Sequence, residues 1–214
     1  HSALHVMRGR LYLSDVDEYR DNTGNHNQMI LLDALSSFDS AIEYDRESGL
    51  AWLGRSRTLR YQGSLNEAEI ALVRARRLIP EHPSIPLEEA QLSMDLGKLD
   101  QANVMISEAS TQLQNNITIP FLKGLIAAKK GNLSEAQDLF TRTLEMDENH
   151  VRARLNRCSA ALLREELGLA LDDANFLVEN RPDLNLARLR RSEILMNLGD
   201  WIEADIELRR LLTK

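Results

Sequence analysis

Alanine recurs at intervals of 34 residues along this chain of 214 residues, and no other feature restricts the fold as strongly. Six successive positions follow the interval: Ala34, Ala68, Ala102, Ala136, Ala170 and Ala204. A period of roughly 20–50 residues is typical of arrays in which each repeat packs on its neighbours. The chain therefore counts as one continuous array, and its length does not indicate how many globular domains it has.

The residues around each alanine predict a helix, a turn and a second helix. Glycine stands five residues before the alanine in four repeats, where it can end the first helix in the left-handed conformation: Gly63, Gly97, Gly131 and Gly199. The next residue and a glutamate three positions later predict a capping box at the start of the second helix: Ser64 with Glu67, Asn132 with Glu135, and Asp200 with Glu203. A small residue precedes the alanine by 12 positions, where two helices would approach closely: Ser56, Ala90, Gly124, Cys158 and Ser192.

This combination of interval, small column, turn glycine and alanine resembles the tetratricopeptide repeat family over nearly the whole chain. The resemblance implies an all-α, right-handed α-solenoid of six helix-turn-helix repeats. In such an array the first helix of each repeat, the A helix, lines a concave groove, and the second, the B helix, forms the back. The predicted repeats cover residues 2–48, 49–82, 83–116, 117–150, 151–184 and 185–214.

The first repeat departs from the pattern through an insertion. Gly9 takes the place of the small residue, but Ala34 follows it after 25 residues, whereas Ala68 follows Ser56 after 12. The 13 additional residues fall within residues 14–28. Their polar run without helical period predicts a surface loop.

The fifth repeat departs from the pattern at its turn. Glu165 stands where glycine is expected, and Gly168 comes three residues later. Because a residue with a Cβ atom adopts the left-handed conformation at a cost, we expect a distorted turn and a weak joint here.

Charge and composition restrict the partners. The 33 acidic and 26 basic residues give a net charge of −7, which offers no general attraction to nucleic acid or to anionic lipid. No apolar run is long enough to cross a bilayer, and no signal peptide opens the chain, so its compartment stays undetermined. The single cysteine, Cys158, excludes an internal disulfide and falls in the small column, which predicts a buried structural thiol.

The sequence carries no recognisable catalytic or cofactor-binding motif. It has no Gly-rich phosphate loop, His-Glu-x-x-His motif or Cys-x-x-Cys motif, and its five histidines are scattered. Asp15, Asp17 and Asp21 do not make a calcium loop, because Tyr19 and Arg20 stand where the EF-hand pattern needs an oxygen ligand and a glycine. We therefore expect a protein that is not an enzyme and holds neither a metal nor a cofactor.

What remains is the surface of the A helices. One apolar column reads Val6, Leu53, Leu87, Phe121, Leu155 and Leu189, and Leu125 lies one helical turn further on. This column either lines the groove or is core, since an A helix must also bury a face. A charged column reads Arg8, Arg55, Glu89, Lys123, Arg157 and Arg191, where a structural role is as plausible as partner contact.

One branch of the family holds the acidic C-terminus of heat-shock chaperones in a clamp of lysine, asparagine and arginine. When the clamp is aligned with repeats four to six, its five positions hold Phe121, Leu125, Asn156, Leu186 and Arg190. Only Asn156 and Arg190 match the residue types of the clamp. The resemblance therefore implies a partly apolar ligand rather than that clamp.

We predict a non-catalytic scaffold that binds an extended or helical segment of another protein. The candidate groove residues are Leu87, Phe121, Leu125, Leu155 and Leu189, with Arg152, Asn156 and Arg190 as polar contacts. Two alternatives stay open. The chain can be the recruitment region of a larger enzyme or envelope-assembly machine, or it can self-associate through its apolar last helix, whose exposed face would otherwise need further residues to cover it.

Overall fold

The computed structural model describes the backbone of residues 1–19 and 24–212, and the side chains of residues 1–14, 28–111 and 113–212. Within these residues the chain forms twelve α-helices and no β-strand, which confirms the all-α prediction. The helices are α1 (Ser2–Tyr19), α2 (Gly24–Tyr44), α3 (Gly49–Tyr61), α4 (Leu65–Leu78), α5 (Ser84–Asp95), α6 (Leu99–Gln112), α7 (Thr118–Lys129), α8 (Leu133–Met146), α9 (Val151–Leu163), α10 (Leu167–Asn180), α11 (Asn185–Leu198) and α12 (Trp201–Leu212).

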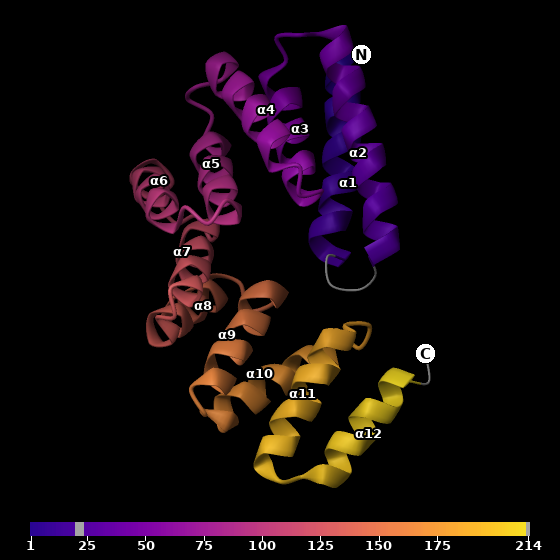
Figure 1. The fold of residues 1–214 in the computed structure, drawn as a ribbon, viewed down its shortest axis with the longest axis vertical. Helices are drawn as coiled ribbons and strands as arrows, with labels where there is room; N and C mark the ends of the chain where they lie inside the picture. The colour runs from indigo at the N-terminus through magenta and orange to yellow at the C-terminus, as the bar shows by residue number, and fades with distance from the viewer. Residues whose placement is uncertain (20–23, 213–214) are drawn as a thin grey trace. The chain divides into compact units, whose positions relative to one another are not determined.

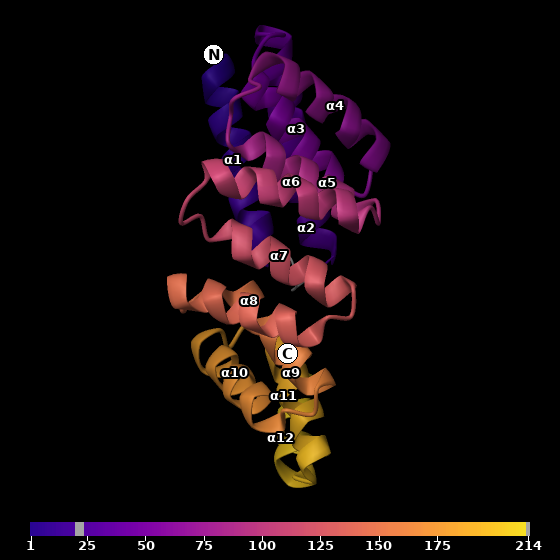
Figure 2. The same ribbon diagram turned by 90° about the vertical axis from the view of Figure 1, so that its left-hand side faces the viewer.

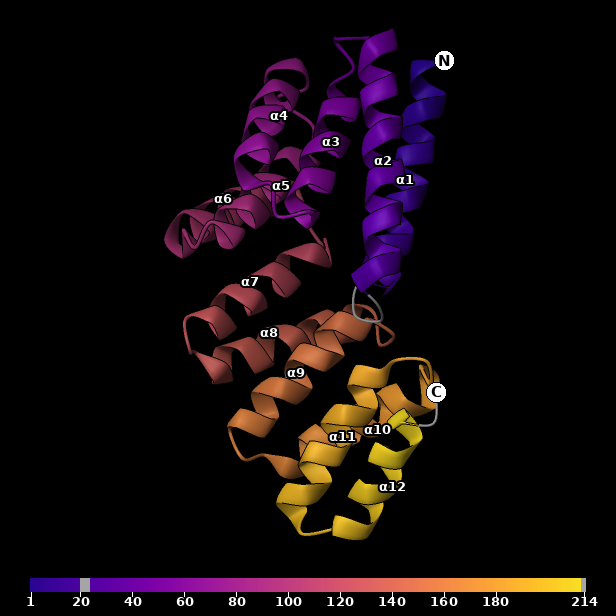
Figure 3. The same cartoon turned by 45° about the vertical axis from the view of Figure 1, so that its right-hand side comes forward.

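The helices form two compact units, unit 1 (His1–Gln114) and unit 2 (Asn115–Lys214), and each is described by itself. Each unit consists of three helix pairs, such as the long pair of α1 and α2 (Figure 3) and the pair of α7 and α8 (Figure 2). Within unit 1 the A helices α1, α3 and α5 contact one another in order, and within unit 2 α7, α9 and α11 do the same. Within each unit a B helix also packs on the A helix that follows it, as α10 does on α11 (Figure 1). The predicted helix pairs are confirmed, while their continuity as one array stays a prediction.

The alanine and small columns lie where two helices of a pair meet. All six repeat alanines are buried, and the Ser56 hydroxyl donates to the Ala68 carbonyl oxygen at 2.9 Å. In the first repeat the small residue makes room for an aromatic ring, because a Cβ atom on Gly9 would lie 2.7 Å from Cζ of Phe38. Gly124 does the same for Phe140, at 2.6 Å. The small column is therefore a packing requirement.

The turn glycines adopt the left-handed conformation that the sequence predicts, with φ between +76° and +82°. At Gly131 the N–H donates to the Ala128 carbonyl oxygen, and the next N–H, of Asn132, donates back to Ala127 at 2.9 Å. The prediction of capping boxes is wrong for two of the three turns. The Ser64 and Asn132 side chains accept no capping hydrogen bond, and the first helical N–H of each helix donates to the carbonyl oxygen of the turn glycine. At Asp200 the predicted cap is present, with Oδ1 accepting from the Glu203 N–H at 3.2 Å.

The fifth turn is not distorted, contrary to the sequence expectation. Glu165 adopts φ +61°, its N–H donates to the Leu162 carbonyl oxygen, and the Glu166 N–H donates to Ala161 at 2.9 Å. This is the hydrogen-bond pattern of the glycine turns. Packing of α9 against α10 fixes the turn, and Glu165 accepts the left-handed strain.

Relieving that strain should stabilise unit 2. We expect Glu165→Gly to raise its free energy of unfolding by about 1 kcal/mol, since the left-handed conformation costs an L-residue roughly 1–2 kcal/mol and glycine loses part of this gain to chain entropy. Gly131→Ala, the reverse change in an equivalent turn, should lower it by a similar amount. Urea denaturation followed by circular dichroism measures both changes. A Glu165→Gly protein that is no more stable than the wild type would show that the turn carries no strain.

The insertion in the first repeat is mainly helical, so the predicted loop over residues 14–28 is wrong for its larger part. Helix α1 continues to Tyr19 and α2 already begins at Gly24, which makes these the two longest helices of the chain. Once a helix is nucleated, each further residue adds a hydrogen bond at low cost, and residues 14–19 contain neither glycine nor proline. Residues 20–23 and the side chains of Asp15, Asp17 and Asp21 lie outside the described part, so the expectation of no calcium site there stays a prediction.

Candidate functional site

Seven of the eight predicted groove residues lie on the A helices of unit 2. Phe121 and Leu125 belong to α7, Arg152, Leu155 and Asn156 to α9, and Leu189 and Arg190 to α11. Because α9 contacts both α7 and α11, these side chains share one row of A helices. Leu87, the eighth, belongs to α5 in unit 1.

The apolar column is core over most of its length, which decides between the two readings that the sequence left open. Phe121 is 4% exposed and Leu155 is 7% exposed, and Leu87 is similarly buried in unit 1. Leu155 belongs to a core cluster with Leu177 and Leu184. The expectation that these three side chains form an open groove wall is thereby corrected, because each is buried.

The remaining predicted residues are accessible. Leu189 is 47% exposed, and Leu125 is half-buried. The Arg152 guanidinium lies 5.0 Å from the centre of the Phe121 ring, so Arg152 and not Phe121 presents the outer surface at this point. The accessible surface therefore combines aliphatic side chains with a cation, on three neighbouring A helices.

Two further polar side chains belong to this surface. Asn156 donates from Nδ2 to the Arg152 carbonyl oxygen at 2.6 Å, which leaves its Oδ1 as an acceptor for a ligand. Arg190 pairs with Glu193 at 2.7 Å, and both side chains are more than a third exposed. An exposed pair of this kind can exchange its partner at little cost.

The charged column has a structural role. Arg157 pairs with the buried Asp173 of α10 at 2.7 Å, and Arg191 pairs with the buried Glu207 of α12 at the same distance. In unit 1, Arg55 pairs with Asp39 of α2 at 2.8 Å. These bonds join an A helix to a B helix, so at these three positions the column stabilises the packing of helices.

A buried ionic network in unit 1 was not predicted from the sequence. Glu88 of α5 is fully buried and accepts from Arg60 Nε at 2.7 Å and from Arg57 Nε at 3.0 Å. Arg60 also pairs with Asp95 at 3.0 Å. Burial by itself would raise the pKa of Glu88, but the two guanidinium groups outweigh burial and hold this pKa below its usual range. One feature of the sequence could have indicated this network. Arg60 occupies an A-helix position that is apolar in four other repeats, where it holds Leu13, Met94, Leu162 and Met196.

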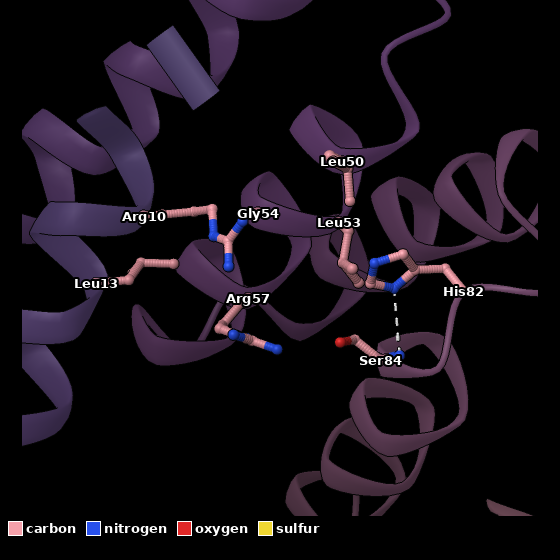
Figure 4. Close-up of a pocket in the computed structure, with 8 residues that line it drawn as sticks. All are labelled: Arg10, Leu13, Leu50, Leu53, Gly54, Arg57, His82 and Ser84. Atoms are coloured by element: carbon pink, nitrogen blue, oxygen red, sulfur yellow. Dashed lines mark hydrogen bonds between the residues drawn. The ribbon is translucent and has the colours of Figure 1, made fainter. Parts of the chain in front are cut away.

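Unit 1 also contains a pocket of about 120 Å³ between α1, α3 and the segment that leads into α5 (Figure 4). Its apolar lining comes from Leu13, Leu50 and Leu53. Its polar lining comes from Arg10, Arg57, His82 and Ser84. His82 precedes α5, and its Nδ1 accepts from the Ser84 N–H at 3.3 Å, which fixes the ring at the edge of the pocket.

The reactive side chains of the chain are in structural positions. Cys158 is fully buried, its thiol donates to the Ala170 carbonyl oxygen at 3.4 Å, and burial raises its pKa to about 12. His150 caps α9 by accepting from the Ala153 N–H, and burial lowers its pKa.

No group of three or more histidine, cysteine, aspartate or glutamate side chains is placed to hold a metal within the described residues. In that same part of the chain, no helix combines the length and the apolar character needed to cross a membrane.

Residues 121–185 match the sequence profile of the tetratricopeptide repeat family. Among solved structures, the Cut9–Hcn1 hetero-tetramer of the APC/C matches with 16% identity and a TM-score of 0.77, over 100% of this chain and 43% of that one. PilW, a type IV pilus biogenesis factor, matches with 18% identity and a TM-score of 0.74, over 96% of this chain and 93% of its own.

Human IFIT1, in a structure with a capped oligonucleotide, matches with 16% identity and a TM-score of 0.81, over 99% of this chain and 50% of its own. The chain thus spans about half the length, or less, of two of these three proteins. At these identities the likeness concerns the fold. Comparison with curated protein sequences gave no match.

Proposed function

We propose that this chain, a member of the tetratricopeptide repeat family by the match of residues 121–185 and by the fold of its helix pairs, is a non-catalytic scaffold that binds a segment of another protein on the A helices of unit 2. One observation carries the proposal. The row of α7, α9 and α11 presents partly exposed aliphatic side chains, Leu125 and Leu189, beside the Arg152 guanidinium and beside Asn156, whose Oδ1 can accept a hydrogen bond. Apolar contacts flanked by a few polar groups are typical of peptide-binding grooves.

The predicted groove is narrower in this proposal than the sequence alone suggested. Phe121 and Leu155 support the surface from beneath, while Leu87 is buried in unit 1. The ligand contacts come from Leu125, Arg152, Asn156, Leu189 and Arg190. This surface includes two arginines, Arg152 and Arg190, whereas the whole chain has a net charge of −7. This charge favours a protein segment over nucleic acid as the ligand, although the fold also occurs in a protein crystallised with RNA.

Photo-crosslinking tests the proposal. A benzoylphenylalanine residue in place of Leu189 should capture a defined protein from lysate, whereas the same residue in place of Asp172, exposed on the B helix α10, should not. Leu189→Asp should abolish co-purification of that protein with the chain, because an unpaired carboxylate would be desolvated in the contact. Its melting temperature should stay within about 2 °C, since an exposed substitution changes stability by at most about 0.5 kcal/mol. Equal capture from both positions, or capture of RNA, would contradict the proposal.

Self-association is a second candidate, and the exposed apolar ends favour it. On α1 the side chains of Leu4 and Leu11 are exposed, whereas their counterparts on α5, Ile85 and Leu92, are buried beneath the preceding B helix. On α12, Trp201 and Ile202 are also exposed. Light scattering at rising concentration separates the two candidates. Self-association predicts a mass above 24.3 kDa that falls on dilution, whereas the scaffold proposal predicts a constant mass.

A further inference from the structure

We propose that the exposed face of α1 binds an amphipathic α-helix of another protein, which packs there as a B helix packs on the A helix after it. This α1 face consists of Leu4, Met7, Arg8 and Leu11, and all four side chains are exposed. It is a second binding surface, because it belongs to unit 1, whereas the accessible groove residues named above belong to unit 2. The inference therefore goes beyond the proposed scaffold function and does not depend on it.

Two leucines of the α1 face occupy positions that are buried in the comparable A helices. Leu4 is 68% exposed and Leu11 is 67% exposed, because α1 packs on α2 and α3 (Figure 3) and neither helix covers them. Four A helices follow a B helix of their own unit, namely α3, α5, α9 and α11, and they bury both equivalent positions. The equivalents of Leu4 are Ala51, Ile85, Ala153 and Ala187, and those of Leu11 are Thr58, Leu92, Ala160 and Ile194.

The preceding B helix is what packs on these equivalent positions. Ile85 and Leu92 of α5 share one core cluster with Ala68 and Leu72 of α4. Ile194 of α11 shares another cluster with alanines of α10. Four of the B helices have 14 residues, which is about four helical turns. A helix of that length would bury the leucines of the α1 face, and this burial favours binding.

Each of these four interfaces also contains a side-chain hydrogen bond made by the residue equivalent to Arg8. In three of them an arginine donates to a side-chain oxygen of the preceding B helix: Arg55 to Asp39 at 2.8 Å, Arg157 to Thr141 at 3.1 Å, and Arg191 to Asn175 at 2.7 Å. In the fourth, Glu89 accepts from Arg76 of α4 at 3.1 Å.

Arg8 makes a different bond. It donates to the hydroxyl of Tyr12, on its own helix, at 3.2 Å, and this bond is exposed. A helix on the α1 face could offer Arg8 the acceptor that the other arginines have. An aspartate suits this position best, because a charge-assisted hydrogen bond is stronger than a neutral one.

The charges favour a helix of another protein over a second copy of this chain, the occupant that self-association would supply. Two α1 helices packed antiparallel would bring their Arg8 side chains together, and residues 2–14 contain no acidic side chain. The last B helix, α12, holds Arg209 at the position of Asp39, Thr141 and Asn175. Stacking of α12 on the α1 of a second copy would place Arg209 opposite Arg8, and like charges opposed across an interface weaken binding.

The test titrates the full chain into a fluorescent helical peptide and follows the anisotropy. The peptide copies α4 (Leu65–Leu78), the B helix that packs on α5, with Val73→Asp at the acceptor position and Arg76→Ala to remove a like charge. A lactam between Asn66→Glu and Ile70→Lys, both exposed in α4, keeps the peptide helical. The control peptide carries Val73→Lys instead. We expect the aspartate peptide to bind at least about tenfold more tightly, the effect of one charge-assisted hydrogen bond.

Variants of the chain identify the surface. Arg8→Glu should reverse the preference, so that the lysine peptide binds more tightly than the aspartate peptide. Leu11→Asp should abolish binding of both peptides, because it places an unpaired carboxylate in the apolar contact. Ile70→Asp, on α4 and 68% exposed, is the matched control and should leave binding unchanged. Both aspartate variants should melt with the wild type, since both substituted side chains are exposed.

Three results would overturn the proposal: equal affinity of the two peptides for the wild type, a preference that Arg8→Glu leaves in place, or binding that survives Leu11→Asp. Light scattering supplies a fourth. A wild-type mass above 24.3 kDa that returns to this value in Leu11→Asp would mean that a second copy occupies the α1 face. The crosslink from Leu189 tests the unit 2 surface separately, so either proposal can fail without the other.

Discussion

Glu88→Ala is expected to lower the free energy of unfolding of unit 1 by about 3–5 kcal/mol, the cost of leaving buried charges without their partner. Arg60, whose side chain is almost fully buried, would keep its bond to the partly exposed Asp95 but lose its bond to Glu88 at 2.7 Å. Arg57 would lose its acceptor as well. Trp52 lies on α3 within this unit, so its fluorescence in a Trp201→Phe background follows the unfolding of unit 1 in urea.

The adjacent glutamate provides the matched control. Glu89 also forms an ion pair, with Arg76 at 3.1 Å, but the Arg76 side chain is largely exposed, so Glu89→Ala should cost at most about 1 kcal/mol. Arg60→Met combined with Glu88→Leu should cost less than the sum of the single changes, because it removes both charges together. If Glu88→Ala and Glu89→Ala unfold at the same urea concentration, the buried network contributes nothing to stability.

The same network gives the stability of unit 1 a dependence on pH. The folded-state pKa of Glu88 lies below its unfolded value of about 4.3, so its contribution is fully present above that pH and is lost as the pH falls through the folded-state pKa. The wild type should therefore lose more stability between neutral pH and strongly acidic pH than Glu88→Ala does. Parallel acid titrations of the two proteins measure the difference.

Leu155→Asp is expected to unfold unit 2, with a loss of more than about 4 kcal/mol. The change removes a core side chain that packs near Leu177 and Leu184, and it places an unpaired carboxylate where Leu155 is 7% exposed. Leu189→Asp is the matched control, because it makes the same substitution in the same column at a position that is 47% exposed. Circular dichroism melts of the two variants should differ widely, with Leu189→Asp close to the wild type.

This pair also tests how the column is divided between core and surface. A Leu155→Asp protein that melts with the wild type would mean that Leu155 is open to solvent, and the wider groove predicted from the sequence would then be restored. A Leu189→Asp protein that fails to fold would mean that no part of the column is available to a partner.

The sequence by itself determined the helix pairs and the contacts within each pair. A 34-residue interval of alanine, a small residue 12 positions earlier and a turn glycine are local requirements, because each concerns two helices joined by a short turn. The buried thiol of Cys158 followed from the same columns. These features depend on residues close together in the chain, so the 34-residue period of the sequence is enough to predict them.

Tertiary structure decided everything that depends on which helix lies beside which. Leu155 and Leu189 occupy equivalent positions in successive repeats, yet the first is covered by the following repeat and the second is not. Glu165 keeps a glycine-like turn because the packing of α9 on α10 imposes it. Arg60 and Glu88 are 28 residues apart and meet because α3 and α5 are neighbours. The repeat period does not specify a bond between two side chains on different A helices, since that bond exists only once the helices are stacked.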